Sequence, residues 1–242
     1  MTRRRWIADE VTGNTAALLG DHAAHLARVL RAEIGQEFDI ATRAEVRRGT
    51  ITSISDDRVE FALGKEQEQA LKPTPNITLA LAIFKFDRME WAIEKCTEIG
   101  VSRIIPVIAR RSDAHLATAA VKRHERWQRI VRQASEQSRR SAPPEIAAPV
   151  KVKDLAGAGV LPAGALTRIV LAESEEGTRL REILQSRPTE VALAVGPEGG
   201  WADEELAWFR ETGWVAASLG DTILRAETAA IVATALALEA LR

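Results

Sequence analysis

From Asn76 to the C-terminus, short apolar runs alternate with longer amphipathic segments. The first run, ITLALAIF at 77–84, is almost wholly apolar, as is typical of a strand covered on both faces. Similar runs follow as RIIPVIA, RIVLA, VALAV and WVAASLG. The segments between them carry apolar residues at helical spacing. Strands that alternate with helices in this way predict an α/β domain with a parallel sheet.

The helix after the first run has a well-defined apolar stripe, and Gly100 follows it as a plausible C-terminal cap. The stripe consists of Met89, Ala92, Ile93, Cys96 and Ile99. Later helices are predicted at about 119–139, 179–186, 202–213 and 226–241.

The first seventy residues follow a different pattern. The runs 37–41, 45–55 and 58–64 alternate apolar and polar residues, which predicts β-strands. The segment 15–35 is interpreted as an inserted helix with Leu18, Leu19, Leu26, Val29 and Leu30 as its apolar positions. Polar residues with two prolines at 65–76 suit a linker. We therefore expect a small barrel-like domain at 1–70 and an α/β domain at 73–242.

Composition narrows the class of protein. The chain has 242 residues, 46% of them hydrophobic, and a net charge of -1, which argues against a protein that coats DNA. Its single cysteine, Cys96, excludes an internal disulfide, and its histidines form no metal-ligand pattern. Without a secretory signal or an apolar stretch of the ~20 residues that span a bilayer, we expect a cytoplasmic protein with no membrane or metal partner.

A glycine-rich loop, GPEGGW, follows the apolar run VALAV and precedes a helix. Gly196, Gly199 and Gly200 permit unusual backbone angles and close approach of a ligand. The loop matches neither GxGxxG nor GxxxxGKS, so dinucleotide and triphosphate binding lose their main support. The simple alternative is a tight turn between strand and helix.

A second loop, LGDTILR, precedes the almost wholly apolar last helix. Arg225 and Glu227 at the start of that helix are costly to bury unless they pair or meet a ligand. Either they form a structural cap with each other, or the loop is part of a binding site. Both loops follow predicted strands, and open α/β sheets bind ligands beyond the carboxyl ends of their strands.

Basic residues concentrate between Arg103 and Arg140, mainly in the predicted helix at 119–139, and in a second cluster near the N-terminus. Four arginines recur at spacings of three or seven: Arg126, Arg129, Arg132 and Arg139. They share roughly one helix face, which either binds phosphates or is simply solvated. Arg3, Arg4 and Arg5 flank Trp6, which either stacks on a base or anchors the core. The candidate RNA-binding residues are Arg3, Arg4, Arg5, Arg110, Arg111, Arg126, Arg129, Arg132, Arg139 and Arg140.

Six stretches in order along the chain resemble the RsmE family of 16S rRNA uridine-N3 methyltransferases, within the SPOUT superfamily. They are RRRWI, HLARVLRAEIGQEF, KFDRMEWAIEKCTEIGV, EQSRRSAPPEI, VGPEGGWADEE and LGDTILRAETAA. The combination of GPEGG with a following LGxxILRxETA is the most specific signal. Two departures stand out: Arg139 occupies a position where the family often has glycine, and Thr222 one where it frequently has arginine.

The resemblance implies an N-terminal PUA-like barrel that contacts RNA and a C-terminal SPOUT α/β domain tied in a trefoil knot. It also implies a homodimer that acts on one uridine of 16S rRNA in the small ribosomal subunit, with S-adenosylmethionine (SAM) as cofactor. By position, the cofactor-binding residues are Leu171, Ala172, Glu173, Gly196, Glu198, Gly199, Gly200, Leu219, Gly220, Ile223, Leu224 and Arg225.

The chemistry needs a positioned base and a stabilised anion. Uridine N3 carries a proton at neutral pH, and its loss leaves negative charge on the ring, which a nearby arginine stabilises. Arg225 or Arg140 is the candidate for that role, and Glu198 is the candidate catalytic base, with solvent as the alternative. Cys96 is a poor nucleophile because it lies on an apolar helix stripe.

Three other functions remain open. A SPOUT ribose 2′-O-methyltransferase would share the glycine loop, but such enzymes typically carry an asparagine- and serine-containing motif where LRAET stands here. A non-catalytic RNA-binding assembly factor would keep the fold without activity. A nucleotide-dependent oxidoreductase is disfavoured because no phosphate-binding fingerprint is present.

Overall fold

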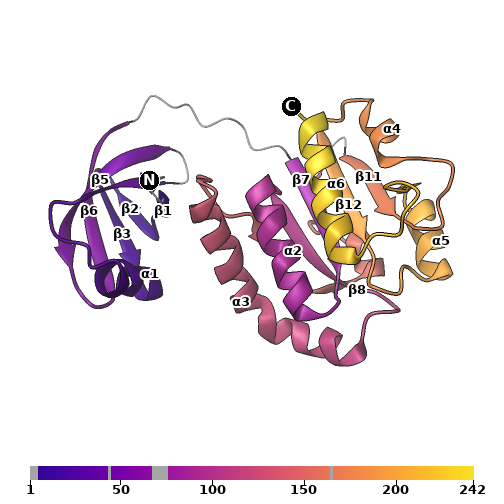
Figure 1. Ribbon diagram of the computed structural model, residues 1–242, viewed down its shortest axis with the longest axis horizontal. Coiled ribbons are helices and arrows are strands. Elements are labelled where there is room, and N and C mark those ends of the chain that lie inside the picture. Colours follow the sequence, from indigo (N-terminus) through magenta and orange to yellow (C-terminus); the bar gives the residue numbers. More distant parts are fainter. Residues whose placement is uncertain (1–4, 43–44, 67–75, 164–165) are drawn as a thin grey trace. The chain divides into compact units, whose positions relative to one another are not determined.

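The computed structural model describes residues 5–42, 45–66, 76–163 and 166–242 (Figure 1). By their internal contacts these residues form two compact units. The first comprises Met1–Pro73 together with Arg132–Pro143, and the second comprises Thr74–Val131 and Pro144–Arg242. The end of the long helix therefore groups with the first unit, which a boundary placed near residues 70–73 does not anticipate.

Six strands form a curled sheet in the first unit, in the order β1-β4-β5-β6-β3-β2. Neighbouring strands are antiparallel except β1 and β4, which are parallel. Only Ala8 and Asp9 separate the two edge strands, so the chain passes from one edge of the sheet to the other and the sheet curls as in a small barrel. The strands are β1 (Arg5–Ile7), β2 (Glu10–Thr12), β3 (Thr15–Leu19), β4 (Glu37–Ala41), β5 (Val46–Ile54) and β6 (Arg58–Glu66).

The core of this unit contains Trp6, which is 1% exposed and packs with Leu18, Leu26, Ile40 and Phe61. A side chain so deeply buried is not available to stack on a base. Trp6 is therefore a core anchor, the second of the two roles considered for it.

The helix predicted for 15–35 is wrong in its first and last parts. Thr15–Leu19 is strand β3, paired antiparallel with β6, and only Gly20–Ala24 (α1) and the π-helix His25–Val29 follow as helix. Gly20, with φ of 53°, separates strand from helix. Leu18 and Leu26 are buried as expected, but Val29 and Leu30 are 65% and 49% exposed. A short apolar run fits strand and helix equally well, and here pairing with β6 decides.

Seven parallel strands form the sheet of the second unit, which confirms the predicted α/β domain with a parallel sheet. Their order is β10-β8-β7-β12-β11-β13, and β9 also pairs with β8. The strands are β7 (Asn76–Ala82), β8 (Arg103–Ile108), β9 (Glu145–Ile146), β10 (Val150–Lys151), β11 (Leu166–Leu171), β12 (Glu190–Val195) and β13 (Val215–Ala217). The short strands β9 and β10 have no clear signal in the sequence.

Helices cover both faces of this sheet, so its strands are apolar on both sides. In β7, Leu79 and Leu81 face one hydrophobic cluster and Ala80 and Ala82 face the other. The first cluster includes residues of α2 (Phe86–Ile99), α3 (Ala114–Gln137), α4 (Leu180–Leu184) and α6 (Ala226–Ala240). The second includes residues of α5 (Asp203–Glu211) and the 3-10 helix Val152–Ala156. Figure 1 shows α2 and α6 side by side, and their residues are in contact.

Within the described ranges, no helix is both long enough and apolar enough to span a membrane. Most of the linker predicted at 65–76 lies outside the described residues.

Candidate active site

A pocket of about 520 Å³ opens at the carboxyl ends of β11, β12 and β13. Because β12 pairs with β11, and β11 with β13, the loops that follow these three strands meet at one edge of the sheet. Strand β7 is the other neighbour of β12 and leads into α2. The pocket walls come from the loops after all four strands, and this edge is where open α/β sheets bind ligands.

The glycine-rich loop after β12 is packed closely against an aromatic ring. A Cβ added to Gly196 would lie only 3.2 Å from Nε1 of Trp201. The same Nε1–H donates a hydrogen bond to the carbonyl of Leu171 at 3.1 Å, which ties the loop to the end of β11. Gly200 has φ of 68°, and an added Cβ would lie 3.2 Å from Oε1 of Glu173. Side chains at Gly196 and Gly200 would therefore crowd the loop.

The loop after β13 is held to the segment at 178–180, where α4 begins. The N–H of Leu180 donates to the carbonyl of Ser218, and the N–H of Ser218 donates to the carbonyl of Thr178, both at 2.9 Å. Arg179 adds an ion pair to Asp221 at 2.6 Å. These contacts fix the start of the loop that leads to Arg225.

Arginine and glutamate side chains form a charged group at the pocket. Nη1 of Arg88 donates to Oε1 of Glu198 at 3.0 Å, and Nε of Arg88 lies 3.9 Å from Oε1 of Glu227. Glu227 therefore pairs with Arg88 and not with Arg225, so the first of the two alternatives, a structural cap in which Arg225 and Glu227 pair with each other, is wrong. Arg225 is the N-cap residue of α6, and its exposed side chain has no hydrogen bond or ion pair to any described residue.

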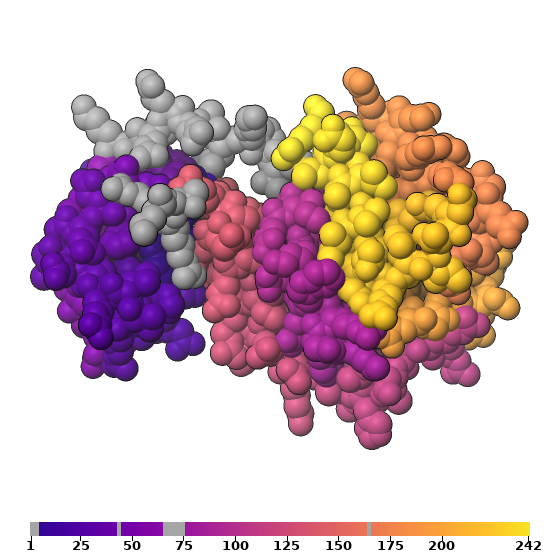
Figure 2. Space-filling view, in the orientation of Figure 1, coloured from indigo at the N-terminus to yellow at the C-terminus, as the bar shows by residue number. Residues whose placement is uncertain are grey.

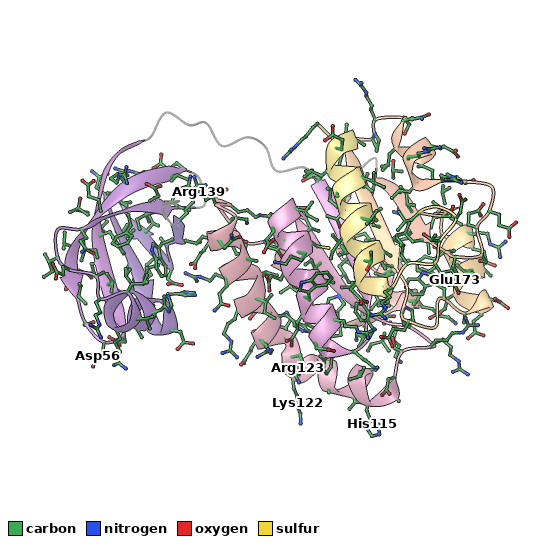
Figure 3. All side chains as sticks on the ribbon, viewed as in Figure 1. Asp56, His115, Lys122, Arg123, Arg139 and Glu173 are labelled. Carbon is green, nitrogen blue, oxygen red and sulfur yellow. The ribbon has the colours of Figure 1, made fainter. Side chains whose placement is uncertain are left out.

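Of the predicted cofactor-binding residues, all but Gly199 line the pocket. Gly199 does not line the pocket, and its carbonyl accepts a hydrogen bond at 2.8 Å from Nη1 of Arg111. Arg111 was predicted to bind RNA, but its guanidinium holds the glycine-rich loop and lines the pocket. Figure 3 labels Glu173, whose carboxylate makes no hydrogen bond or ion pair to the described residues.

Sequence reasoning missed several pocket residues, above all Lys85 and Arg88 at the start of α2. Their signal was the KFDRM block, which directly follows the apolar run of β7. Only the pairing of β7 with β12 brings that block to the glycine-rich loop.

Arg140, the second candidate for anion stabilisation, does not line this pocket. It belongs to the first unit, where burial lowers the pKa of its guanidinium to about 10. The pocket thus contains Arg225 and Glu198 from the predicted catalytic set, and the catalytic role of all three residues stays a prediction.

The predicted RNA-binding arginines differ in whether their side chains already pair with other residues of the protein. In the first unit, Arg132 is paired with Asp9 and donates from Nη2 to the carbonyl of Ile7 at 2.6 Å. In the second unit, Nε of Arg126 lies 2.8 Å from both carboxylate oxygens of Glu90. Arg129 is exposed and has no such partner among the described residues.

The remaining candidates lie outside the pocket or outside the described chain. Nε of exposed Arg110 lies 3.7 Å from Oε1 of Glu204. Arg139 follows α3 and has φ of 60°, and its carbonyl accepts a hydrogen bond from Arg5 (Figure 3). Burial lowers the pKa of the Arg5 guanidinium. Arg3 and Arg4 lie outside the described residues.

Cys96 is fully buried in α2 and does not line the pocket. Burial raises the pKa of its thiol to about 12, against a smaller lowering by the hydrogen bond from the Thr234 hydroxyl. A thiol in this environment is inert, as its place on the apolar stripe predicts. In the part of the chain that the structure describes, no group of three His, Cys, Asp or Glu residues could hold a metal ion.

Known proteins resemble this chain in sequence. Residues 71–238 fit the model of a family described as an RNA methyltransferase domain. A ribosomal RNA small subunit methyltransferase E of Synechocystis sp. is 34% identical over 94% of this chain and 74% of its own length. Its namesake in Aquifex aeolicus is 30% identical over 93% of this chain and 94% of its own.

A solved structure agrees with these sequence relatives. The ribosomal RNA small subunit methyltransferase E of Neisseria gonorrhoeae, bound to S-adenosyl methionine, has a TM-score of 0.83 and 29% identity and covers 96% of this chain and 95% of its own. The chain therefore belongs to the RNA methyltransferase domain family, and within it to the RsmE family of ribosomal RNA small subunit methyltransferases. The resemblance carried by the sequence motifs is confirmed.

Proposed function

We propose that this chain transfers the methyl group of SAM to N3 of the uridine at position 1498 of 16S rRNA. Relatives in the RsmE family are named for small-subunit rRNA methylation, and the Neisseria structure was solved with SAM bound. The observation that carries the proposal is the pocket at the sheet edge, where Arg225 has no partner among the described residues and Glu198 is held by Arg88.

The residues present fit the cofactor. A pocket of about 520 Å³ lies within the range of ~300–1,000 Å³ that is usual for small-molecule sites. The crowding at Gly196 and Gly200 leaves backbone in place of side chains along one wall. When bound, SAM supplies an electrophilic methyl group on a positively charged sulfur. The loops 171–174, 195–201 and 217–226 would hold it.

The residues of the chain then have to prepare the nucleophile. Glu198 accepts the proton of uridine N3 as a general base and passes it to solvent. The negative charge that remains on the uracil ring is stabilised by Arg225, whose guanidinium is not neutralised by a carboxylate of the described chain. Positioning of N3 against the methyl group adds to the rate by proximity.

The substrate must present a free base edge, because N3 lies on the Watson–Crick edge of uracil. The uridine is therefore unpaired, or leaves its stack to enter the pocket. We assign the curled sheet of the first unit to a PUA-like RNA-binding domain and the second unit to a SPOUT domain. The reaction then takes place in the cytoplasm on the small ribosomal subunit or its RNA.

The proposal includes a homodimer and a trefoil knot. Exposed apolar side chains on two neighbouring helices support the dimer: Trp91 of α2 is 47% exposed and Leu236 of α6 is 39% exposed. Figure 2 shows α2 and α6 forming one continuous surface. A Trp91→Glu variant that remains dimeric by light scattering would exclude this face. The knot rests on the family resemblance; the hydrogen bonds between Ser218 and the segment at 178–180 only hold two of the pocket loops together.

Two measurements test the function. Calorimetry should detect binding of SAM to the purified chain, and labelled SAM should transfer its methyl group to small subunits isolated from cells that lack the gene. Absence of SAM binding would overturn the assignment of the pocket. Transfer to a ribose 2′-oxygen in place of uracil N3 would keep the pocket and overturn the proposed target.

A further inference from the structure

A buried carboxylate lies next to the proposed active site without being part of its wall. Glu227, in the first turn of α6, has a side chain that is 8% exposed. Its Oε2 is buried and has no hydrogen-bond partner in the described ranges. Burying an ionised carboxylate is costly unless a positive charge compensates it. A positive charge close to Glu227 is therefore needed to stabilise its carboxylate.

The compensating charge is Arg88, which lines the pocket, whereas Glu227 does not. The guanidinium is placed between two carboxylates, with Nη1 3.0 Å from Glu198 and Nε 3.9 Å from Glu227. The three residues come from the glycine-rich loop, α2 and α6. Arg88 thus links the candidate base to a carboxylate that the protein keeps out of solvent.

We propose that Glu227 and Arg88 are positioning residues: Glu227 fixes the guanidinium of Arg88, and Arg88 holds Glu198 in place over the pocket. An arginine side chain has many rotamers, and a second anion behind it limits them. The planar guanidinium then presents Nη1 to Glu198 in one orientation. This inference rests on the proposed role of Glu198 as the base.

An ordinary structural ion pair between α2 and α6 is the alternative. A purely structural pair would contribute to folding and act on transfer independently of Glu198. A positioning pair would lower the rate only through Glu198, and its contribution would vanish once Glu198 is replaced. The two roles therefore differ in a double-mutant cycle.

The experiment compares the wild type, Glu198→Gln, Glu227→Gln and the double variant in single-turnover methyl transfer to small subunits at saturating SAM. We expect Glu227→Gln to slow transfer by about tenfold or more, because small misplacements of a reacting group are costly. The double variant should be no slower than Glu198→Gln alone. SAM affinity should change by less than about threefold, since Glu227 does not line the pocket.

Glu98→Gln is the control for loss of an ion-paired carboxylate, because Glu98 lies on α2, the helix of Arg88, and pairs with Lys95 at 2.8 Å outside the pocket lining. It should transfer methyl groups at the wild-type rate. The inference would be overturned if the transfer rates lost in the two single variants multiplied in the double variant. It would also be overturned if Glu227→Gln transferred methyl groups at the wild-type rate.

A second pair of variants tests the inference if Glu227→Gln does not fold. Arg88→Lys keeps one positive charge but lacks the planar fork, and it should slow transfer in the wild-type background but not in Glu198→Gln. Equal slowing in both backgrounds would contradict the proposal. The proposed function fails separately, if the wild type neither binds SAM nor methylates the subunit.

Discussion

The indole N–H of Trp201 donates a hydrogen bond to the carbonyl of Leu171, with 3.1 Å between Nε1 and O. Trp201 is 4% exposed and lies against the backbone of Gly196, so this bond joins the end of β11 to the loop after β12 at the pocket. Both segments belong to the proposed cofactor site. The bond should therefore matter for stability and for cofactor affinity together.

Trp201→Phe keeps an aromatic ring but removes the donor. We expect it to lower the free energy of unfolding by about 1–3 kcal/mol, as when a buried carbonyl loses its partner, and to weaken SAM binding. Denaturant unfolding and calorimetry measure the two effects. Trp208→Phe is the control, since Trp208 packs on the Phe209 ring as Trp201 does, and its indole N–H makes no hydrogen bond to a described residue. Equal effects in both variants would contradict the role of the bond.

Arg225→Ala should reduce methyl transfer by about a hundredfold to a thousandfold, the usual cost of removing one group that stabilises a developing anion. The melting temperature should stay unchanged, because the Arg225 guanidinium has no hydrogen bond or ion pair within the described chain. Arg181→Ala, at an exposed position of α4 outside the pocket, is the control. Wild-type turnover in Arg225→Ala would remove this arginine from the mechanism.

The left-handed backbone of Arg139 predicts a gain in stability from glycine. Its φ of 60° costs a non-glycine residue about 1–2 kcal/mol, and the family often has glycine here. Arg139→Gly should therefore be about 1 kcal/mol more stable in urea than Arg139→Ala, which also removes the guanidinium but keeps a Cβ. If the alanine variant were the more stable of the two, the strain would be absent.

Acid should destabilise the first unit through Asp9. Burial raises the pKa of its carboxyl, but the His22 ring, whose Nδ1 lies 3.8 Å from Oδ2, and hydrogen bonds from Arg132 and the Leu19 N–H outweigh this and bring the pKa down from 3.8 to about 2. Because the folded-state pKa lies below the unfolded one, the stabilisation is complete above about pH 4 and is lost as the pH falls towards 2.

The size of this contribution is on the order of 2 kcal/mol. Unfolding of the wild type followed from pH 6 to pH 2 should show the loss, and Asp9→Asn should be less stable at pH 6 with a flatter acid slope. Identical slopes for the two proteins would show that Asp9 does not govern this range.

Arg129 is the helical arginine of α3 best placed to contact RNA phosphates, since Arg126 and Arg132 are already paired with carboxylates. Arg129→Ala should weaken RNA binding and reduce the slope of log affinity against log salt by about 1, as for one lost phosphate contact. Filter binding at several salt concentrations measures this. Arg181→Ala, which removes one exposed arginine from α4 instead of α3, is the control. An unchanged slope in Arg129→Ala would mark this helix face as solvated.

Much of the second unit was predictable because its main strands are continuous apolar runs and its helices either carry one apolar stripe or, like α6, are almost wholly apolar. The runs 77–84 and 191–195 became β7 and β12, and the segments at 202–213 and 226–241 contain α5 and α6. The segment 15–35 failed because an apolar run as short as Thr15–Leu19 has no period that separates strand from helix.

The pocket residues in the loops after β11, β12 and β13 could be predicted from the sequence. The residues that reach the pocket only because of the order of the strands in the sheet could not. Loops after β11, β12 and β13 were identified from glycine patterns and family resemblance. The partner of Glu227 was missed because Arg88 is distant in the sequence and reaches it only through the packing of α2 on α6. The pairing of Arg132 with Asp9 was hidden for the same reason.

The central claim is that this chain methylates N3 of one 16S rRNA uridine, and mass spectrometry of nucleosides from small-subunit RNA tests it most directly. RNA from cells without the gene should lack 3-methyluridine, and the wild-type gene, but not the Arg225→Ala variant, should restore it in full. Unchanged 3-methyluridine in cells without the gene would contradict the account.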